Sequence, residues 1–120
     1  MHILLITPYT PDNQGVGVSY TSQLIIELAK EHSIDLVYFR YAEEKPYKPI
    51  NQNVRVLKEK VISTKDKLIG MLQQPLMFPL FSSRYDRNIR IFLQKQIKEV
   101  DYDFIYFDFS QTFSFAKYLN

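Results

Sequence analysis

The sequence predicts one α/β domain with a mostly parallel β-sheet, and three observations support that prediction. The chain has 120 residues, which is enough for one domain but not for two. Almost continuous apolar runs at 2–7 and 34–39 are typical of strands buried on both faces of a parallel sheet. A loop and an amphipathic helix separate these runs, so residues 1–39 form a compact strand–helix–strand unit. The expected architecture is therefore Rossmann-like, with three layers.

The first predicted strand, His2–Thr7, ends at Pro8, and a loop that contains proline and glycine follows it. We expect a helix to begin near Val18 or Ser19 and to close at His32–Ser33. Its apolar face is set by residues at helical spacing: Val18, Thr21, Leu24, Ile25, Leu28 and Ala29. After the second strand, a polar loop with prolines leads to a short third strand at 54–57.

The second half of the chain predicts a short helix over 65–74 and a long amphipathic helix over Ser83–Val100. Ser82 or Ser83 is expected to cap the long helix, with Asp86 in its first turn. One face of this helix is formed by Tyr85, Ile89, Phe92, Leu93, Gln96, Ile97 and Val100. The opposite stripe, expected to be a solvated face, consists of Arg84, Arg87, Lys95 and Lys98. Docking of this stripe to anionic lipid is the alternative.

Two further segments complete the predicted fold. Residues 75–81 are apolar but broken by prolines, so no regular helix is expected there. We expect Leu76–Phe81 to cover the edge of the sheet, with an exposed acceptor loop or a membrane contact as the alternative. A fourth strand is predicted at 104–107, followed by a turn at 109–112 and a helix at 113–119.

Composition excludes several classes of function. The absence of cysteine excludes disulfides, thiolate catalysis and cysteine-based zinc sites. A net charge of +2 gives no electrostatic case for nucleic acid. The opening apolar run is too short for a secretory signal, and no segment approaches the roughly 20 apolar residues of a spanning helix. We expect a cytoplasmic protein, with peripheral contact at the inner face of the membrane left open.

Ligands of open parallel sheets bind beyond the carboxyl ends of the strands, where the loops 7–17 and 108–112 should lie. The triplet Gly15, Val16, Gly17 leads into a helix N-terminus, which favours an anion. A plain turn that needs glycine at positive φ is the alternative. The triplet does not extend to G-x-G-x-x-G, because Tyr20 occupies the last position, and it is not a P-loop. Binding of NAD and hydrolysis of NTP are therefore poorly supported.

The remaining titratable residues favour structural roles. His2 and His32 have no partner at the spacing of a metal site, so we expect surface histidines and no bound metal. Asp101, Asp103 and Asp108 flank the fourth strand, and capping and solvation explain them better than metal coordination.

Several ordered motifs resemble the retaining glycosyltransferases of the group 1 or family 4 kind, which have the two-domain GT-B fold. The resemblance spans most of the chain and is strongest over 1–39 and 102–108. It begins with the strand His2–Thr7, the Thr/Pro loop and the glycine pair, and continues with Leu28–His32 and the strand that opens Ile34-Asp35-Leu36-Val37. Tyr102–Tyr106 is similar to a later strand of the family, in which aspartate stands between hydrophobic residues.

The resemblance implies an N-terminal domain that mainly binds the acceptor, a glycan or a lipid-linked glycan. Its loop of Gly15, Val16 and Gly17 would face the donor diphosphate and the transferred sugar. A C-terminal domain, absent from these residues, would bind the nucleoside diphosphate sugar, which is a co-substrate; no cofactor or metal is implied. The fragment alone is then expected to be inactive, and the parent enzyme would act in polysaccharide biosynthesis of the cell envelope.

One position departs from the family. Many members have a histidine just after the fourth strand, where this chain has Asp108. A carboxylate can accept a hydrogen bond from a sugar hydroxyl but cannot act as a neutral imidazole does. Asp108 is therefore a weak catalytic candidate, and Ser110 and Gln111 are the better candidates for polar contacts to the acceptor sugar.

Two rival functions follow from the same residues. The chain is alternatively a non-catalytic subunit of a split transferase that binds the acceptor or docks to the membrane. A flavodoxin-like or receiver-like module is the other rival. The ending Thr7-Pro8 of the first strand argues against both of these modules, because a receiver needs acidic residues there and a flavodoxin a loop rich in hydroxyls and glycine.

Overall fold

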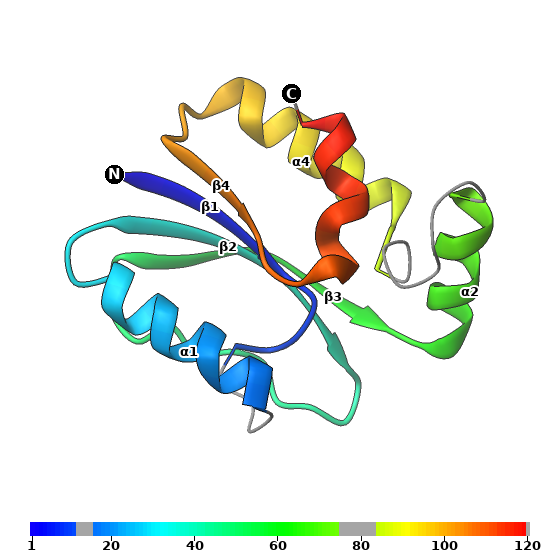
Figure 1. The fold of residues 1–120 in the computed structure, drawn as a ribbon, viewed down its shortest axis with the longest axis horizontal. Helices are drawn as coiled ribbons and strands as arrows, with labels where there is room; N and C mark the ends of the chain where they lie inside the picture. The colour runs from blue at the N-terminus through cyan, green and yellow to red at the C-terminus, as the bar shows by residue number, and fades with distance from the viewer. Residues whose placement is uncertain (12–15, 75–83, 120) are drawn as a thin grey trace.

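The computed structural model describes residues 1–11, 16–74 and 84–119, although not the side chains of residues 16–19, 110 and 111. These residues form a three-layer α/β fold (Figure 1). A four-stranded sheet lies in the middle, with helix α1 on one face and helix α4 and the 3₁₀ helix η1 on the other. The predicted fold class is confirmed.

The sheet contains β1 (His2–Thr7), β2 (Ser33–Tyr41), β3 (Val54–Ile62) and β4 (Phe104–Phe107). The strand order is β3-β2-β1-β4, and every neighbouring pair is parallel. β1 is central because it pairs with β2 on one side and with β4 on the other. This order brings the carboxyl ends of β1, β2 and β4 to one edge of the sheet, although β4 comes from the far end of the sequence.

β3 is longer than the predicted strand at 54–57. It continues to Ile62 through the charged residues Lys58, Glu59 and Lys60, which indicate a loop when hydropathy alone is considered. β3 is an edge strand, and charged side chains on an edge strand prevent pairing with other chains. A register shift between Leu36 and Val37 of β2 adapts the pairing with β3.

Helix α1 (Val16–Leu28) covers the face of the sheet around β1 and β2. Ile25 and Ala29 pack there with residues of the strands and of the β2–β3 loop: Leu5, Ile34, Leu36, Tyr38, Tyr47 and Val54. The predicted start near Val18 was late, because Val16 and Gly17 already belong to the helix. No described glycine has a positive φ, so the turn alternative does not apply to Gly17. Gly15 lies outside the described residues.

Helix α4 (Arg87–Glu99) and η1 (Ser110–Tyr118) cover the opposite face. The buried core of that face contains Leu4, Ile6, Val37, Phe39, Ile62, Tyr85, Ile89, Leu93, Phe115 and Leu119. The prediction that α4 begins at Ser83 was wrong. Asp86 has an extended backbone and caps the helix, since its side chain accepts a hydrogen bond from Ile89 N at 3.0 Å. Ser82 and Ser83 lie outside the described residues.

The C-terminal segment also differs from the prediction of a turn at 109–112 and a helix at 113–119. η1 is a 3₁₀ helix over the whole of Ser110–Tyr118. Bonds from Thr112 N to Phe109 O at 3.4 Å and from Leu119 N to Ala116 O at 3.2 Å have the i to i+3 spacing of this helix.

Helix α2 (Thr64–Gln73) follows β3 and confirms the predicted short helix. Ser63 and Asp66 form a reciprocal capping box, which satisfies backbone N–H groups at the helix start. Figure 1 places α2 beyond the carboxyl end of β3. The predictions for residues 75–81 lie outside the described residues.

Candidate functional site

The carboxyl edge of the sheet is where the sequence predicts a site, and Asp108 is its most constrained titratable residue. Asp108 follows β4, and its N–H donates to Ile6 O of β1 at 2.8 Å. Its carboxylate accepts hydrogen bonds from the hydroxyls of Thr7 at 3.0 Å and Thr21 at 2.5 Å. Asp108 thus connects β4, the end of β1 and helix α1.

Asp108 is a buried carboxylate without a cation among its described contacts. The residue is 5% exposed. Burial raises its pKa above the ordinary value, and the hydrogen bonds from Thr21 and Thr7 offset part of that rise. The expectation that solvation explains Asp108 was therefore wrong. Its two hydroxyl partners instead give it a positioning role, and its assignment as a catalytic candidate stays a prediction.

Phe109, the next residue, has a strained backbone. Its φ of 60° and ψ of 161° lie in a region that is almost exclusive to glycine, and Phe109 is the one described non-glycine residue with a positive φ. Hydrogen bonds hold the backbone before and after this φ angle: Asp108 N donates to Ile6 O at 2.8 Å, and Phe109 O accepts from Thr112 N at 3.4 Å. The Phe109 ring meets the Tyr9 ring edge-on at 5.8 Å. Such strain is often found at ligand sites.

A row of cations and tyrosines continues from Tyr9 along this edge. The Arg84 guanidinium lies over the Tyr9 ring at 5.3 Å and over the Tyr41 ring at 5.7 Å, and its Nε donates to Pro8 O at 3.1 Å. Lys67 of α2 lies over the same Tyr41 ring at 4.7 Å. The expectation that Arg84 belongs to a solvated helix stripe was wrong, because it precedes α4 and is only 4% exposed.

The other predicted site residues lie at the same edge of the fold. Val16 and Gly17 form the first turn of α1, and Ser110 and Gln111 form the first turn of η1. The side chains of these residues, and Gly15 as a whole, lie outside the described part of the structure. Their proposed contacts to sugar and phosphate therefore stay predictions. Thr10, in the loop after β1, contributes a buried hydroxyl that has no hydrogen-bond partner in the described structure.

A second polar cluster, at the amino ends of the strands, was not predicted. The buried carboxylate of Asp35 accepts hydrogen bonds from Arg55 at 3.1 and 3.2 Å and from Tyr102 at 2.6 Å, and it contacts His2 at 3.0 Å. Burial and the Asp35 carboxylate raise the pKa of Tyr102. An aspartate inside an apolar strand is a readable signal, because a buried charge requires partners. This cluster joins β1, β2, β3 and the approach to β4.

The histidines have structural contacts. His32 Nδ1 lies 3.0 Å from the N-terminal amine, and the His2 ring packs on Tyr102 with 4.7 Å between ring centroids. Among residues 1–11, 16–74 and 84–119, no group of three histidine, aspartate or glutamate side chains is arranged to hold a metal ion.

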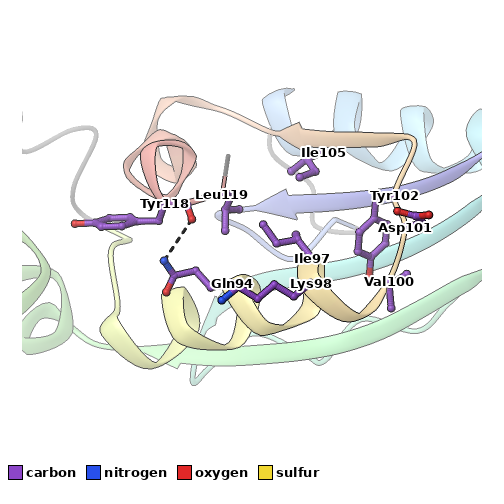
Figure 2. Close-up of a pocket in the computed structure, with 9 residues that line it drawn as sticks. All are labelled: Gln94, Ile97, Lys98, Val100, Asp101, Tyr102, Ile105, Tyr118 and Leu119. Atoms are coloured by element: carbon purple, nitrogen blue, oxygen red, sulfur yellow. Dashed lines mark hydrogen bonds between the residues drawn. The ribbon is translucent and has the colours of Figure 1, made fainter.

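A cavity of about 590 Å³ lies between α4, η1 and β4. Figure 2 shows the residues that line it. Gln94, Ile97, Tyr102, Ile105 and Tyr118 are among its lining residues, and Gln94 donates to Tyr118 O at 3.3 Å across it. This cavity lies beside the open edge of β4 rather than at the carboxyl ends of the strands. Lys98 and Asp101 also line it, but no hydrogen bond or ion pair of the described structure joins these two residues to each other or to Tyr102 and Tyr118. The carboxyl edge therefore remains the better candidate site.

Comparisons with known proteins add no family assignment. No family model, curated protein or solved structure matches the chain. Within the part of the chain that the structure describes, none of the helices combines the length and the apolar character needed to cross a membrane.

Proposed function

We propose that the chain is the acceptor-side, N-terminal domain of a glycosyltransferase that moves a sugar from a nucleoside diphosphate sugar to a glycan or lipid-linked acceptor. The observation that carries the proposal is the convergence of three segments at the carboxyl edge of a parallel sheet. These are the loop after β1, the start of α1, and Asp108–Phe109 after β4. The ordered sequence motifs that resemble the family occupy the same segments.

In this proposal Asp108 is a positioning residue. Its carboxylate accepts hydrogen bonds from Thr7 and Thr21, so it fixes the end of β1 relative to α1. Precise placement of the acceptor contributes much of the rate in a transfer reaction, since it removes the entropic cost of bringing two substrates together. Gly15, Val16 and Gly17 would face the donor diphosphate, and Ser110 and Gln111 would contact the acceptor sugar.

The complete enzyme would also need a donor domain to bind the nucleotide and to stabilise the charge that develops on the leaving diphosphate. No residue of this chain is assigned to the nucleotide, and only Gly15, Val16 and Gly17 would face the diphosphate. The chain alone would therefore bind the acceptor without transferring sugar.

A second candidate function is a non-catalytic binding subunit, and the open edge of β4 favours it. In the described structure β4 pairs with β1 alone, and its four residues carry no charge, unlike those of the opposite edge strand β3. Phe104 is 58% exposed and Tyr106 is exposed as well, whereas Ile105 and Phe107 of the same strand pack against the core beneath α4 and η1. An uncharged edge strand with exposed aromatic rings is suited to pairing with another polypeptide segment.

A transfer assay separates the two candidates. The native gene, with everything encoded after codon 120, is expressed, and its product is incubated with labelled UDP- and GDP-sugars and a cell-envelope lipid extract. The proposal predicts transfer of label to a lipid or glycan. It also predicts a lower transfer rate in Asp108→Asn, with an unchanged rate in the surface control Lys30→Gln. Absence of transfer from every donor, by a folded product, would contradict the proposal and favour the binding subunit.

A further inference from the structure

The cations beside Tyr41 are placed for a ligand of opposite charge. Lys67 and Arg84 both lie over one tyrosine ring, and they come from separate elements: α2 and the segment before α4. Neither residue takes part in any ion pair formed among the described residues. Arg84 is also buried, and a buried guanidinium without a carboxylate is costly unless another anion compensates it.

The carboxylates closest in sequence to Lys67 and Arg84 make other contacts. Asp86 caps α4 through Ile89 N and pairs with Lys60 at 3.5 Å. Asp66, next to Lys67, accepts from Ser63 N at 2.9 Å and from Ser63 Oγ at 3.0 Å. These contacts hold both carboxylates in helix caps.

One carboxylate does approach Tyr41, but it binds the backbone. Glu44 Oε1 accepts a hydrogen bond from Tyr41 N at 2.7 Å. The positive charges still dominate at the ring: burial raises the Tyr41 pKa, yet Lys67 and Arg84 more than offset this, and the net pKa is lowered. The local potential therefore favours a negative charge near the phenol oxygen.

We propose that Lys67 and Arg84 bind a phosphate group of the acceptor beside Tyr41. The inference rests on the proposed function, since it names the chemistry of the acceptor at the same edge of the sheet. Arginine presents a planar fork of donors that matches phosphate oxygens, and lysine adds a mobile point charge. Partial exposure of Lys67 and Tyr41 gives a ligand access to this position.

The test measures binding of inorganic pyrophosphate to the chain by calorimetry at about 0.1 M salt. At this ionic strength, exposed charges more than about 10 Å apart are largely screened from one another. Lys67→Gln should weaken binding about tenfold, which corresponds to the loss of one charge-assisted hydrogen bond. Arg84→Lys keeps the charge but loses the fork, so it should also weaken binding. Lys30→Gln, an exposed lysine paired with Glu27, is the matched control and should bind like the unaltered chain.

A second experiment distinguishes a lipid phosphate from a soluble phosphate. Vesicles of phosphatidylglycerol are compared with vesicles of phosphatidylcholine in a flotation assay. Lys67-dependent flotation with phosphatidylglycerol supports a lipid phosphate, whereas Lys67-dependent binding of pyrophosphate without flotation supports a soluble phosphorylated acceptor. If Lys67→Gln, folded by circular dichroism, binds both probes as Lys30→Gln does, or neither probe binds to the unaltered chain, the proposal is wrong.

These outcomes are distinct from failure of the glycosyltransferase proposal. Transfer to a neutral acceptor without pyrophosphate binding would overturn the phosphate site alone. Lys67-dependent pyrophosphate binding by a native gene product that transfers no sugar would support the anion site and contradict the glycosyltransferase proposal.

Discussion

The Thr21 hydroxyl of α1 donates a hydrogen bond to the Asp108 carboxylate after β4, at 2.5 Å. The two residues are 87 positions apart in the sequence, and the bond is buried. Together with the Thr7 hydroxyl, it joins α1, β1 and β4 at the edge where the candidate site lies. This contact makes the geometry of the site depend on one carboxylate.

Removal of the Thr21 hydroxyl should destabilise the chain. Thr21→Val leaves Asp108 with one donor fewer, so we expect a loss of about 1.5–3 kcal/mol in the free energy of unfolding at pH 7. The loss should grow as pH rises through the folded pKa of Asp108, because the hydroxyl stabilises the charged form. Urea unfolding at a series of pH values from about pH 4 to about pH 8, with linear extrapolation of the free energy to water, measures this loss. Thr21→Ser, which keeps the hydroxyl, is the control; an equal loss in both variants would contradict the account.

The charge of Asp108 should make stability depend on pH in an unusual direction. Its folded pKa is raised above the ordinary 3.8, so the folded state binds the proton more tightly than the unfolded state. Its contribution to stability is therefore full below the unfolded pKa and is lost as pH rises through the folded pKa. Asp108→Asn cannot titrate, which makes it the reference.

The measurement is the difference in unfolding free energy between the unaltered chain and Asp108→Asn, followed upward from about pH 3.8. We expect the unaltered chain to lose stability relative to Asp108→Asn as pH rises, and the difference then to level off. A gain in the stability of the unaltered chain relative to Asp108→Asn as pH rises would mean that the folded pKa of Asp108 is lowered instead.

The backbone of Phe109 should prefer glycine to alanine. Both substitutions remove the ring contact with Tyr9, but only glycine adopts φ near 60° with ψ near 161° without strain. Phe109→Gly should therefore be more stable than Phe109→Ala by about 1 kcal/mol in thermal or urea unfolding. Phe104, in the extended strand β4, is the control, where alanine should be the more stable of the two. The same order at both positions would remove the evidence for strain.

The Asp35 cluster should contribute to stability through Tyr102. Tyr102→Phe removes the hydroxyl that donates to Asp35 and accepts from Gln96 at 2.9 Å, so we expect a loss of about 1–3 kcal/mol in unfolding free energy. Tyr20→Phe, at a residue that is 63% exposed, should change stability by less than about 0.5 kcal/mol. Chemical denaturation of the two variants tests this, and equal effects would count against a structural role for the cluster.

The strands and the layer arrangement were readable because β1 and the start of β2 are almost continuous apolar runs, which indicate burial on both faces. The length of β3 was underestimated because Lys58, Glu59 and Lys60 lie on an edge strand, where charged residues can still pair with the neighbouring strand. The 3₁₀ form of η1 was missed because a helical pattern of this length does not distinguish the two kinds of helix.

The site was less readable than the fold. Position 108 was identified from its place after the fourth strand, but its partners Thr7 and Thr21 follow from tertiary contacts that no local pattern encodes. Arg84 was assigned to a helix face because helical spacing continues past the true cap at Asp86. Its packing between Tyr9 and Tyr41 depends on how the chain returns to the carboxyl edge of the sheet.

The glycosyltransferase assignment is tested first by reading the gene downstream of codon 120. The assignment predicts a donor domain with a second Rossmann-like pattern and an acidic donor motif, encoded in frame over roughly one to two domain lengths or by a neighbouring gene. A stop codon at that point, with no donor-domain gene nearby, would contradict the assignment to a glycosyltransferase and leave a binding module.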